Sequence, residues 1–155
     1  MRAAALWLAL LAAAIPAAQT RPQDRPSDRP RIEIVDAWAR TAISSRDTTA
    51  FVTIVNRGDA DDALVGVSSP IAERAAVQRV RHRGLTSTNR DVPRVEVEAA
   101  DVVRMRPGGY FISVTGLTQQ LQPGQKLPLS LRFEKSGTLA VDAEVSNQKL
   151  GNRGR

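Results

Sequence analysis

The feature that most constrains this chain is a series of short segments in which apolar and polar residues alternate. These segments are 32–40, 49–56, 63–68, 75–83, 95–98, 101–106, 110–117, 127–133 and 138–145. A period of two is that of a β-strand with one buried and one open face, and turn residues separate most of the segments. No segment keeps the helical period of 3.6. The pattern predicts an all-β fold of about nine short strands in an antiparallel sandwich or barrel.

Some details of this fold follow from single motifs. A Pro-Gly-Gly turn at 107–109 divides the β-rich segment 102–117, which predicts a β-hairpin there. Trp38 is predicted to lie in the core because no other side chain after residue 18 has so large a ring. The polar segment 84–93 is predicted to be a loop, and the acidic segment 59–62 a solvated turn.

The chain has 155 residues, of which 42% are hydrophobic, and this suits one domain with one core, predicted over 32–145. Residues 1–18 contain one positive charge, an apolar run too short to span a bilayer, and small residues after a proline, which predicts a signal peptide and export. The segment 19–31 is rich in Arg and Pro and is predicted to be a disordered linker. The segment 146–155 is predicted to be a basic, flexible tail.

The cysteine count and the charge distribution narrow the class of protein. There is no cysteine, so we expect neither a lipid anchor at the cleavage point nor a disulfide, and a soluble exported chain without a transmembrane span after cleavage. The net charge of +6 comes from the two ends, because 32–145 has equal numbers of acidic and basic residues. Aromatic residues are scarce, at 4%. Binding to nucleic acid is therefore not expected.

Several motifs resemble those of the PCu(A)C family of periplasmic copper chaperones. They are Val35-Asp36-Ala37-Trp38-Ala39-Arg40, the segments 50–56 and 62–70, Pro107-Gly108-Gly109-Tyr110, Gly116-Leu117, and the segment 121–133 with Pro123-Gly124 and Leu127-Pro128-Leu129. The resemblance covers 32–145. It implies a cupredoxin-like antiparallel β-sandwich in the bacterial periplasm. It also implies a link to Cu(I) transport and to assembly of the copper centre of cytochrome oxidase.

The positions where that family places its copper ligands hold other residues here. By the resemblance, His belongs at Gln78 and Phe111, and Met belongs at Ser113 and Thr115. A further Met pair belongs near 88–92, which contains no Met. Cu(I) prefers thioether, thiolate and imidazole ligands. We therefore expect a site depleted of its metal ligands and no bound cofactor, with Cu(I) as the cofactor if the family function is retained.

Met105 and His82 are the soft ligands that remain after residue 18. Met105 stands at a strand position where an unbranched apolar side chain fills the core. His82 lies between two arginines, which disfavour a nearby cation. Both are weak candidates for a metal site. One alternative interpretation nevertheless keeps a Cu(I) carrier that uses these two residues or ligands from another chain.

A second alternative is a small-ligand or anion binder. Five arginines at alternate positions form its candidate anion stripe: Arg79, Arg81, Arg83, Arg104 and Arg106. The polar groups at the former ligand positions would supply hydrogen bonds to the same ligand.

The sequence contains no enzymatic motif. Its single His is flanked by Arg, and it has no Gly-x-Ser-x-Gly elbow and no phosphate-binding loop. We predict that the protein is not an enzyme. The favoured interpretation is a non-metal interaction module on the PCu(A)C fold, with a periplasmic protein as its partner. The sequence predicts neither the identity of that partner nor the oligomeric state.

Overall fold

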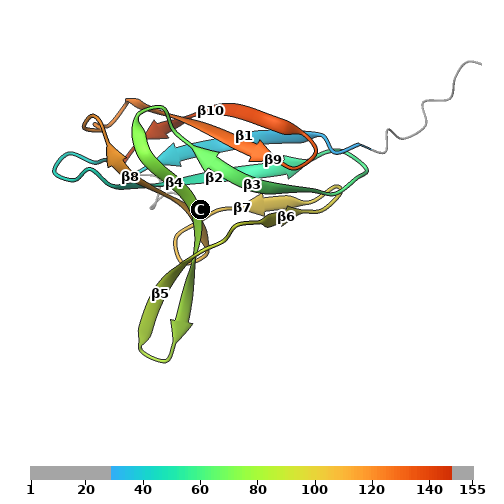
Figure 1. Ribbon diagram of the computed structural model, residues 1–155, viewed down its shortest axis with the longest axis horizontal. Coiled ribbons are helices and arrows are strands. Elements are labelled where there is room, and N and C mark those ends of the chain that lie inside the picture. Colours follow the sequence, from blue (N-terminus) through green and yellow to red (C-terminus); the bar gives the residue numbers. More distant parts are fainter. Residues whose placement is uncertain (1–28, 148–155) are drawn as a thin grey trace, which may run out of the picture.

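Ten β-strands make up most of residues 29–147, which are the residues that the computed structural model describes (Figure 1). The strands are β1 (Ile32–Ala39), β2 (Thr48–Asn56), β3 (Asp62–Ser68), β4 (Ala72–Arg83), β5 (Thr86–Asp91), β6 (Val95–Val97), β7 (Val102–Arg104), β8 (Tyr110–Leu117), β9 (Lys126–Phe133) and β10 (Gly137–Val145). The predicted signal peptide and most of the predicted linker and tail lie outside the described residues. Within 29–147, no helix has the length and apolar character needed to cross a membrane.

The strands form one mixed sheet in the order β5-β4-β8-β2-β1-β10-β9-β3-β6, with β7 added to β2. The pair β1 and β10 is parallel, and the other pairs are antiparallel. One hydrophobic cluster takes residues from β4 and β8, near one end of this order, and from β9, β3 and β6, near the other. The sheet therefore folds over a single core. The predicted all-β, single-domain fold is confirmed, with one parallel pair as a difference.

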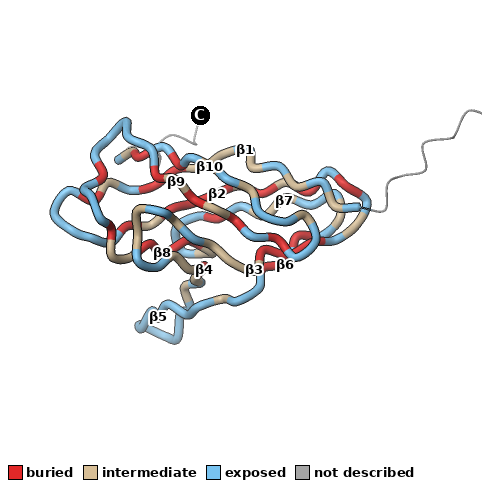
Figure 2. Tube along the Cα trace, turned by 45° about the horizontal axis from the view of Figure 1, so that its top comes forward, coloured by how far each residue is buried: buried red, intermediate tan, exposed pale blue. Residues whose placement is uncertain are grey.

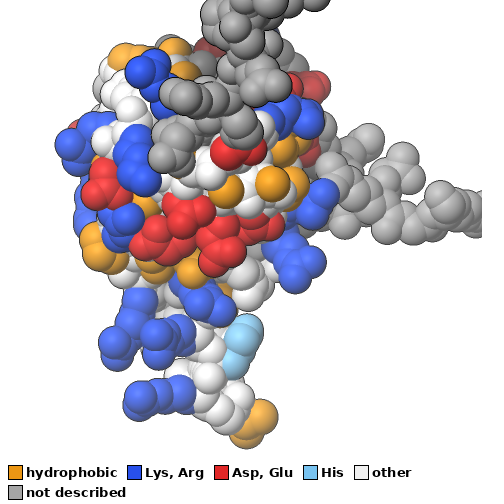
Figure 3. Space-filling model, turned by 90° about the vertical axis from the view of Figure 1, so that its right-hand side faces the viewer, with side chains coloured by type: hydrophobic (Ala, Val, Ile, Leu, Met, Phe, Trp, Pro, Cys, Tyr) orange, Lys and Arg blue, Asp and Glu red, His pale blue; other side chains and the backbone are white. Residues whose placement is uncertain are grey.

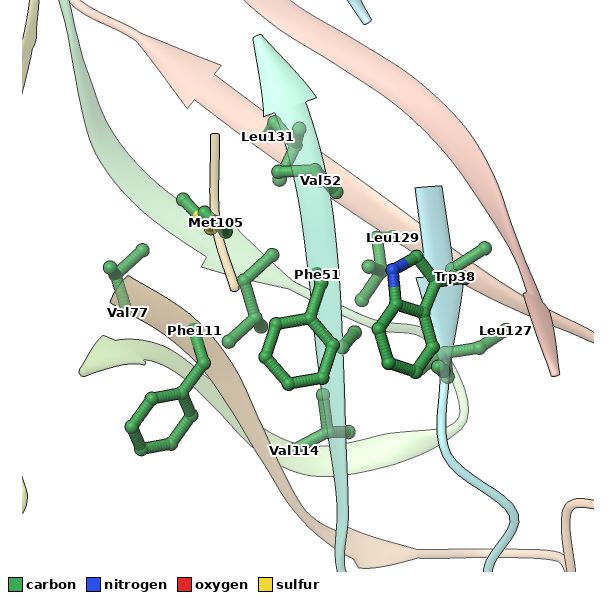
Figure 4. Close-up of a cluster of buried hydrophobic side chains, with 14 of the residues drawn as sticks. Trp38, Phe51, Val52, Val77, Met105, Phe111, Val114, Leu127, Leu129 and Leu131 are labelled. Atoms are coloured by element: carbon green, nitrogen blue, oxygen red, sulfur yellow. The ribbon is translucent and has the colours of Figure 1, made fainter. Parts of the chain in front are cut away.

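The core contains the stacked rings of Trp38 and Phe51, whose centroids lie 4.5 Å apart. Trp38 is 8% exposed, so its predicted place in the core is confirmed. Three leucines at alternate positions of β9 belong to the same cluster: Leu127, Leu129 and Leu131 (Figure 4). This is the period of two expected of a strand with one buried face. Buried residues run through the body of the molecule, whereas the end of β4 and all of β5 are exposed (Figure 2).

A hairpin of β4 and β5 occupies the segment that the sequence predicted as a loop. The residues of β5 pair antiparallel with the last six residues of β4, so the prediction of a loop over 84–93 is wrong. All six β5 residues are exposed, and for that reason the segment has no alternating apolar pattern that would reveal a strand. Gly84, with a φ of 58°, adopts the left-handed conformation that the tight turn requires.

The strands β7 and β8 do not form the hairpin predicted across 107–109. Both pair with β2, β7 at 53–55 and β8 at 48–50. The intervening turn is tight, since the Arg106 amide donates to the Tyr110 carbonyl at 2.9 Å. The turn thus moves the chain from one stretch of β2 to the next, and the predicted ladder between its two arms is wrong.

The acidic segment 59–62 is solvated only in part. Asp59 is exposed, whereas Asp62 is 2% exposed. The Asp62 carboxylate accepts hydrogen bonds from the backbone amides of Ala63, Lys135 and Ser136 at 2.8 to 2.9 Å. The prediction of a solvated turn is therefore wrong for Asp62, which instead joins the start of β3 to the β9–β10 turn.

Candidate functional site

The four positions where the resemblance predicts family ligands lie on one face of two adjacent strands. Gln78 of β4 is the register partner of Phe111 of β8. Ser113 and Thr115 follow Phe111 at intervals of two, so their side chains leave β8 on the same side. We call this surface, made of Gln78, Phe111, Ser113 and Thr115, the ligand-position face. The strand register thus brings together the positions that the sequence singled out.

Asp91 is the centre of the polar contacts on the ligand-position face. It is the register partner of Gln78 in β5, and its Oδ1 accepts a hydrogen bond from Gln78 Nε2 at 2.7 Å. Its Oδ2 forms an ion pair with Arg74, which lies opposite Thr115. The hydrogen bond from Gln78, together with the charge of Arg74, holds the pKa of Asp91 below its usual value. An amide, a carboxylate and a guanidinium are therefore linked through the two oxygens of Asp91.

This network is unsuited to Cu(I). Carboxylate and amide oxygens are hard ligands, whereas Cu(I) binds soft sulfur and imidazole groups. The guanidinium of Arg74 also places a permanent positive charge on the face, which repels a cation. What the network can do chemically is donate and accept hydrogen bonds, because Arg74 and Asp91 are both exposed.

Phe111 is a packed ring at a position where the resemblance predicts a ligand. It is 8% exposed and belongs to the core cluster. In Figure 4 it lies at the opposite end of the drawn cluster from Trp38. Ser113 and Thr115 are half-buried and offer hydroxyl groups. On the ligand-position face, the Phe111 side chain therefore serves core packing.

The structure does not bring Met105 and His82 together. Met105 lies in the core, 5% exposed, and its backbone amide donates to the Val52 carbonyl at 2.9 Å. His82 lies on the exposed part of β4, where its Nδ1 is 2.8 Å from Ser87 Oγ. Among the described residues, no group of three or more His, Cys, Asp or Glu side chains is placed to hold a metal ion.

Comparison with known proteins places this chain in a family. A family model described as Putative lipoprotein LpqE-like matches residues 32–145, which is most of the chain. The chain belongs to the LpqE-like family. Among curated proteins, this LpqE-like chain is 27% identical over 117 residues to Putative lipoprotein Lxx21020 of Leifsonia xyli subsp. xyli (strain CTCB07), a match that covers 75% of this chain and 70% of that protein.

Solved PCuAC domains share the fold of this LpqE-like chain. The apo PCuAC domain from PmoF1 matches with a TM-score of 0.63 at 22% identity, over 77% of this chain and 96% of that one. The copper-bound PCuAC domain from PmoF2 matches with a TM-score of 0.61 at 23% identity, over 74% and 92%. CuI-DR1885 from Deinococcus radiodurans matches with a TM-score of 0.58 at 25% identity, over 75% and 80%. The resemblance to the PCu(A)C family is confirmed.

The predicted arginine stripe is divided in this LpqE-like fold. Arg79, Arg81 and Arg83 occupy alternate positions at the exposed end of β4. Arg104 lies on β7, which pairs with β2 and not with β4 or β5. Arg106 precedes β8, in the turn closed by its own amide and the Tyr110 carbonyl. Three of the five arginines therefore share one strand, and Arg104 belongs to another part of the sheet.

Sequence reasoning missed three charged residues that matter here. Arg90 lies on β5 opposite Arg79, and it was hidden in the segment predicted as a loop. Arg74 and Asp91 are 17 residues apart, and only the pairing of β4 with β5 brings them together. An alternating pattern in β5 would have indicated this pairing, but its polar composition gave no such signal.

Proposed function

We propose that this LpqE-like chain is an exported, copper-chaperone-related domain that serves as a non-metal interaction module for a periplasmic protein partner. The observation that carries the proposal is the network of Gln78, Asp91 and Arg74 on the ligand-position face. Gln78 stands at a position where the resemblance predicts a soft ligand, and Asp91 and Arg74 extend its contacts. Export is supported by the lipoprotein relative and by the predicted signal peptide.

The same residues give the module a surface suited to polar recognition. Arg74 and Asp91 are exposed, and each keeps hydrogen-bonding capacity beyond the contacts it makes within the chain. Phe111, which is buried and belongs to the core cluster, lies opposite Gln78, so the polar groups stand on a packed part of the sheet. A face of this kind recognises hydrogen-bonding groups of a partner and performs no chemistry, in keeping with a non-enzymatic, chaperone-like family.

The competing function is Cu(I) transport through Met105 and His82. It requires Met105 to leave the core, where it is 5% exposed, and to meet a histidine on the exposed end of β4. Emptying that core position costs on the order of 2–5 kcal/mol, which weakens any copper affinity gained. The favoured function does not carry this cost.

A Cu(I) titration tests the proposal. Residues 19–155, which include every described residue, are titrated under reducing conditions against a chromophoric Cu(I) chelator of moderate affinity. The PCuAC domain from PmoF2, which has been solved with copper bound, serves as the positive control. We expect the PmoF2 domain to withdraw Cu(I) from the chelator and this chain to withdraw none. If this chain binds one Cu(I), and Met105→Leu or His82→Ala abolishes that binding, the interaction-module proposal is wrong.

A further inference from the structure

The end of β4 and the whole of β5 form an arm that extends beyond the body of the molecule (Figure 1). β4 pairs with β8 only as far as Arg79. Beyond that point the Val80 amide still donates to the Gly109 carbonyl at 3.3 Å, but the strand partner of β4 is β5, which is an edge strand of the described sheet. We call residues 79–90 the arginine arm. Because all of β5 is exposed, the arm contributes little to the core and is free to meet another surface.

The arginine arm carries a concentrated positive charge. Its twelve residues include four arginines and no Asp or Glu: Arg79, Arg81, Arg83 and Arg90. The alternation of β4 and the register between Arg79 and Arg90 place all four on one face. Figure 3 shows basic side chains along one side of the projecting arm. Four positive side chains on one face create a local positive potential that attracts anions.

Most of this charge is not neutralised within the described chain. The Arg79 guanidinium lies 5.0 Å from the centroid of the Tyr110 ring, a cation–π contact that leaves its charge in place. Arg81, Arg83 and Arg90 make no ion pair with any of residues 29–147. The acidic side chain nearest in sequence, Asp91, is already paired with Arg74. The arm is therefore a cationic surface that can bind an anionic partner.

The tip of the arm is apolar. Leu85 follows the turn glycine Gly84, and its relative exposure is 108%, the highest among the exposed large hydrophobic residues of the described chain. A single exposed leucine is common on protein surfaces. Leu85 differs in its position, because it stands at the far end of a projection, two residues beyond Arg83, with which β4 ends.

Charge and apolar tip together select one class of partner. An acidic polypeptide would satisfy the arginines and leave Leu85 in water, and a second copy of the chain would oppose one arginine row to another. A bilayer with anionic lipids satisfies both features, because phosphate headgroups lie above an apolar layer. We propose that the arginine arm docks on the surface of an anionic phospholipid bilayer, with Leu85 at the acyl boundary and the arginines among the headgroups.

This docking does not depend on the function proposed for the ligand-position face. It uses the arginine face and the tip of the arm, whereas the face is built on Gln78, Asp91 and Arg74. Docking by the arm would hold the domain at the membrane and leave the ligand-position face for a protein partner. A result on Cu(I) binding therefore says nothing about docking, and the two proposals fail separately.

Vesicle co-sedimentation of residues 19–155 tests the inference. The vesicles contain phosphatidylcholine alone or phosphatidylcholine with phosphatidylglycerol. We expect binding to the mixed vesicles, which weakens as added salt shortens the Debye length from about 10 Å to about 3 Å. Arg81→Gln with Arg83→Gln should weaken binding by about fivefold for each arginine removed, and Leu85→Ser should weaken it further. The matched control is Arg40→Gln with Arg104→Gln, which removes the same charge from exposed positions outside the arm.

The control keeps both chain ends unchanged, so a loss seen only in the arm variants assigns binding to the arm. Equal losses in the arm and control variants overturn the inference, as does the absence of binding to mixed vesicles.

A Leu85→Trp variant reports on the tip directly. Its fluorescence should shift to shorter wavelength with mixed vesicles and stay unchanged with soluble poly-L-glutamate. A response to poly-L-glutamate without a response to vesicles would mean that the partner is an acidic polypeptide.

Discussion

Asp62 shows how much a single residue contributes to this fold. Burial of its carboxylate acts to raise its pKa, but hydrogen bonds from Ser136, Lys135 and Ala63 outweigh that effect and hold the pKa of Asp62 below its usual value. A carboxyl whose pKa is lower in the folded state stabilises the fold above its unfolded pKa. That contribution is lost as the pH falls through the folded value. Asp62 is therefore a source of acid-sensitive stability.

We expect Asp62→Asn to lower the free energy of unfolding at neutral pH by about 1–3 kcal/mol, because an amide presents an N–H group to one of the backbone donors. The difference from the native chain should shrink as the pH falls below about 4, because the carboxyl of the unfolded chain is then protonated and that of the folded chain follows at a lower pH. Urea unfolding as a function of pH measures both quantities. Asp59→Asn, at an exposed position of the same turn, is the control and should change stability by less than about 0.5 kcal/mol. An equal loss at Asp59 would contradict this account.

Residues of this kind mark the limit of what the sequence predicts. The place of Trp38 in the core follows from its size and its strand position, which are local properties. The burial of Asp62 depends on Lys135, which is 73 residues away, and on the turn after β9 that presents its amide. The pairing of Asp91 with Arg74 depends in the same way on the register between β4 and β5. A local pattern contains no information about such partners.

At the scale of strands, the sequence predicted those strands that bury one face. It did not predict β5, which buries neither face. β9 alternates buried leucines with exposed or half-buried residues, and its period of two is visible in the sequence. β5 has no buried residue, so its existence depends on the backbone of β4 and on the turn at Gly84. The partners of β7 and β8 were also missed, because a turn motif fixes the local chain path and not which strand lies beside it.

The arginine arm should therefore open independently of the core. Gly84 has a φ of 58°, which a β-branched side chain adopts only with strain. We expect Gly84→Val to increase hydrogen exchange of the arm amides by about tenfold or more, because local opening requires little loss of core packing beyond that of Val80. Global stability should stay within about 0.5 kcal/mol of the native value. Hydrogen exchange with mass spectrometry measures the arm, and urea unfolding measures the whole domain.

The matched control for the arm is Gly84→Asn, since Asn tolerates the left-handed conformation. Its exchange should remain close to that of the native arm. If Gly84→Val lowers global stability by several kcal/mol, the arm is part of the cooperative core and the separation described here is wrong.

At the scale of the whole molecule, frame and site are separable. The fold matches an apo and a copper-bound PCuAC domain with similar TM-scores, 0.63 and 0.61, so the likeness in fold is the same whether or not the matched domain holds copper. In this chain Phe111 contributes core packing at a position where the family is expected to place a ligand. The domain would thus have packing and a polar network where other members bind a metal, with the same fold. The sequence predicted the fold from its motifs, but not the network of Gln78, Asp91 and Arg74.

This separation predicts that copper binding can be grafted back. We expect a variant with Gln78→His, Phe111→His and Ser113→Met, together with Arg74→Gln to remove the repelling charge, to bind one Cu(I) per chain. Without copper the variant should melt at a lower temperature than the native chain, because Phe111 is buried. With free Cu(I) at about 100 times the dissociation constant, binding adds about 2.7 kcal/mol, which raises the melting temperature by several degrees. The native chain should show no such rise, and neither should Gln78→His alone, which supplies a single ligand. Thermal unfolding with and without Cu(I) compares the three. A folded graft that gains nothing from Cu(I) would mean that the strands carrying the ligand-position face have moved away from the PCuAC geometry, and that frame and site changed together.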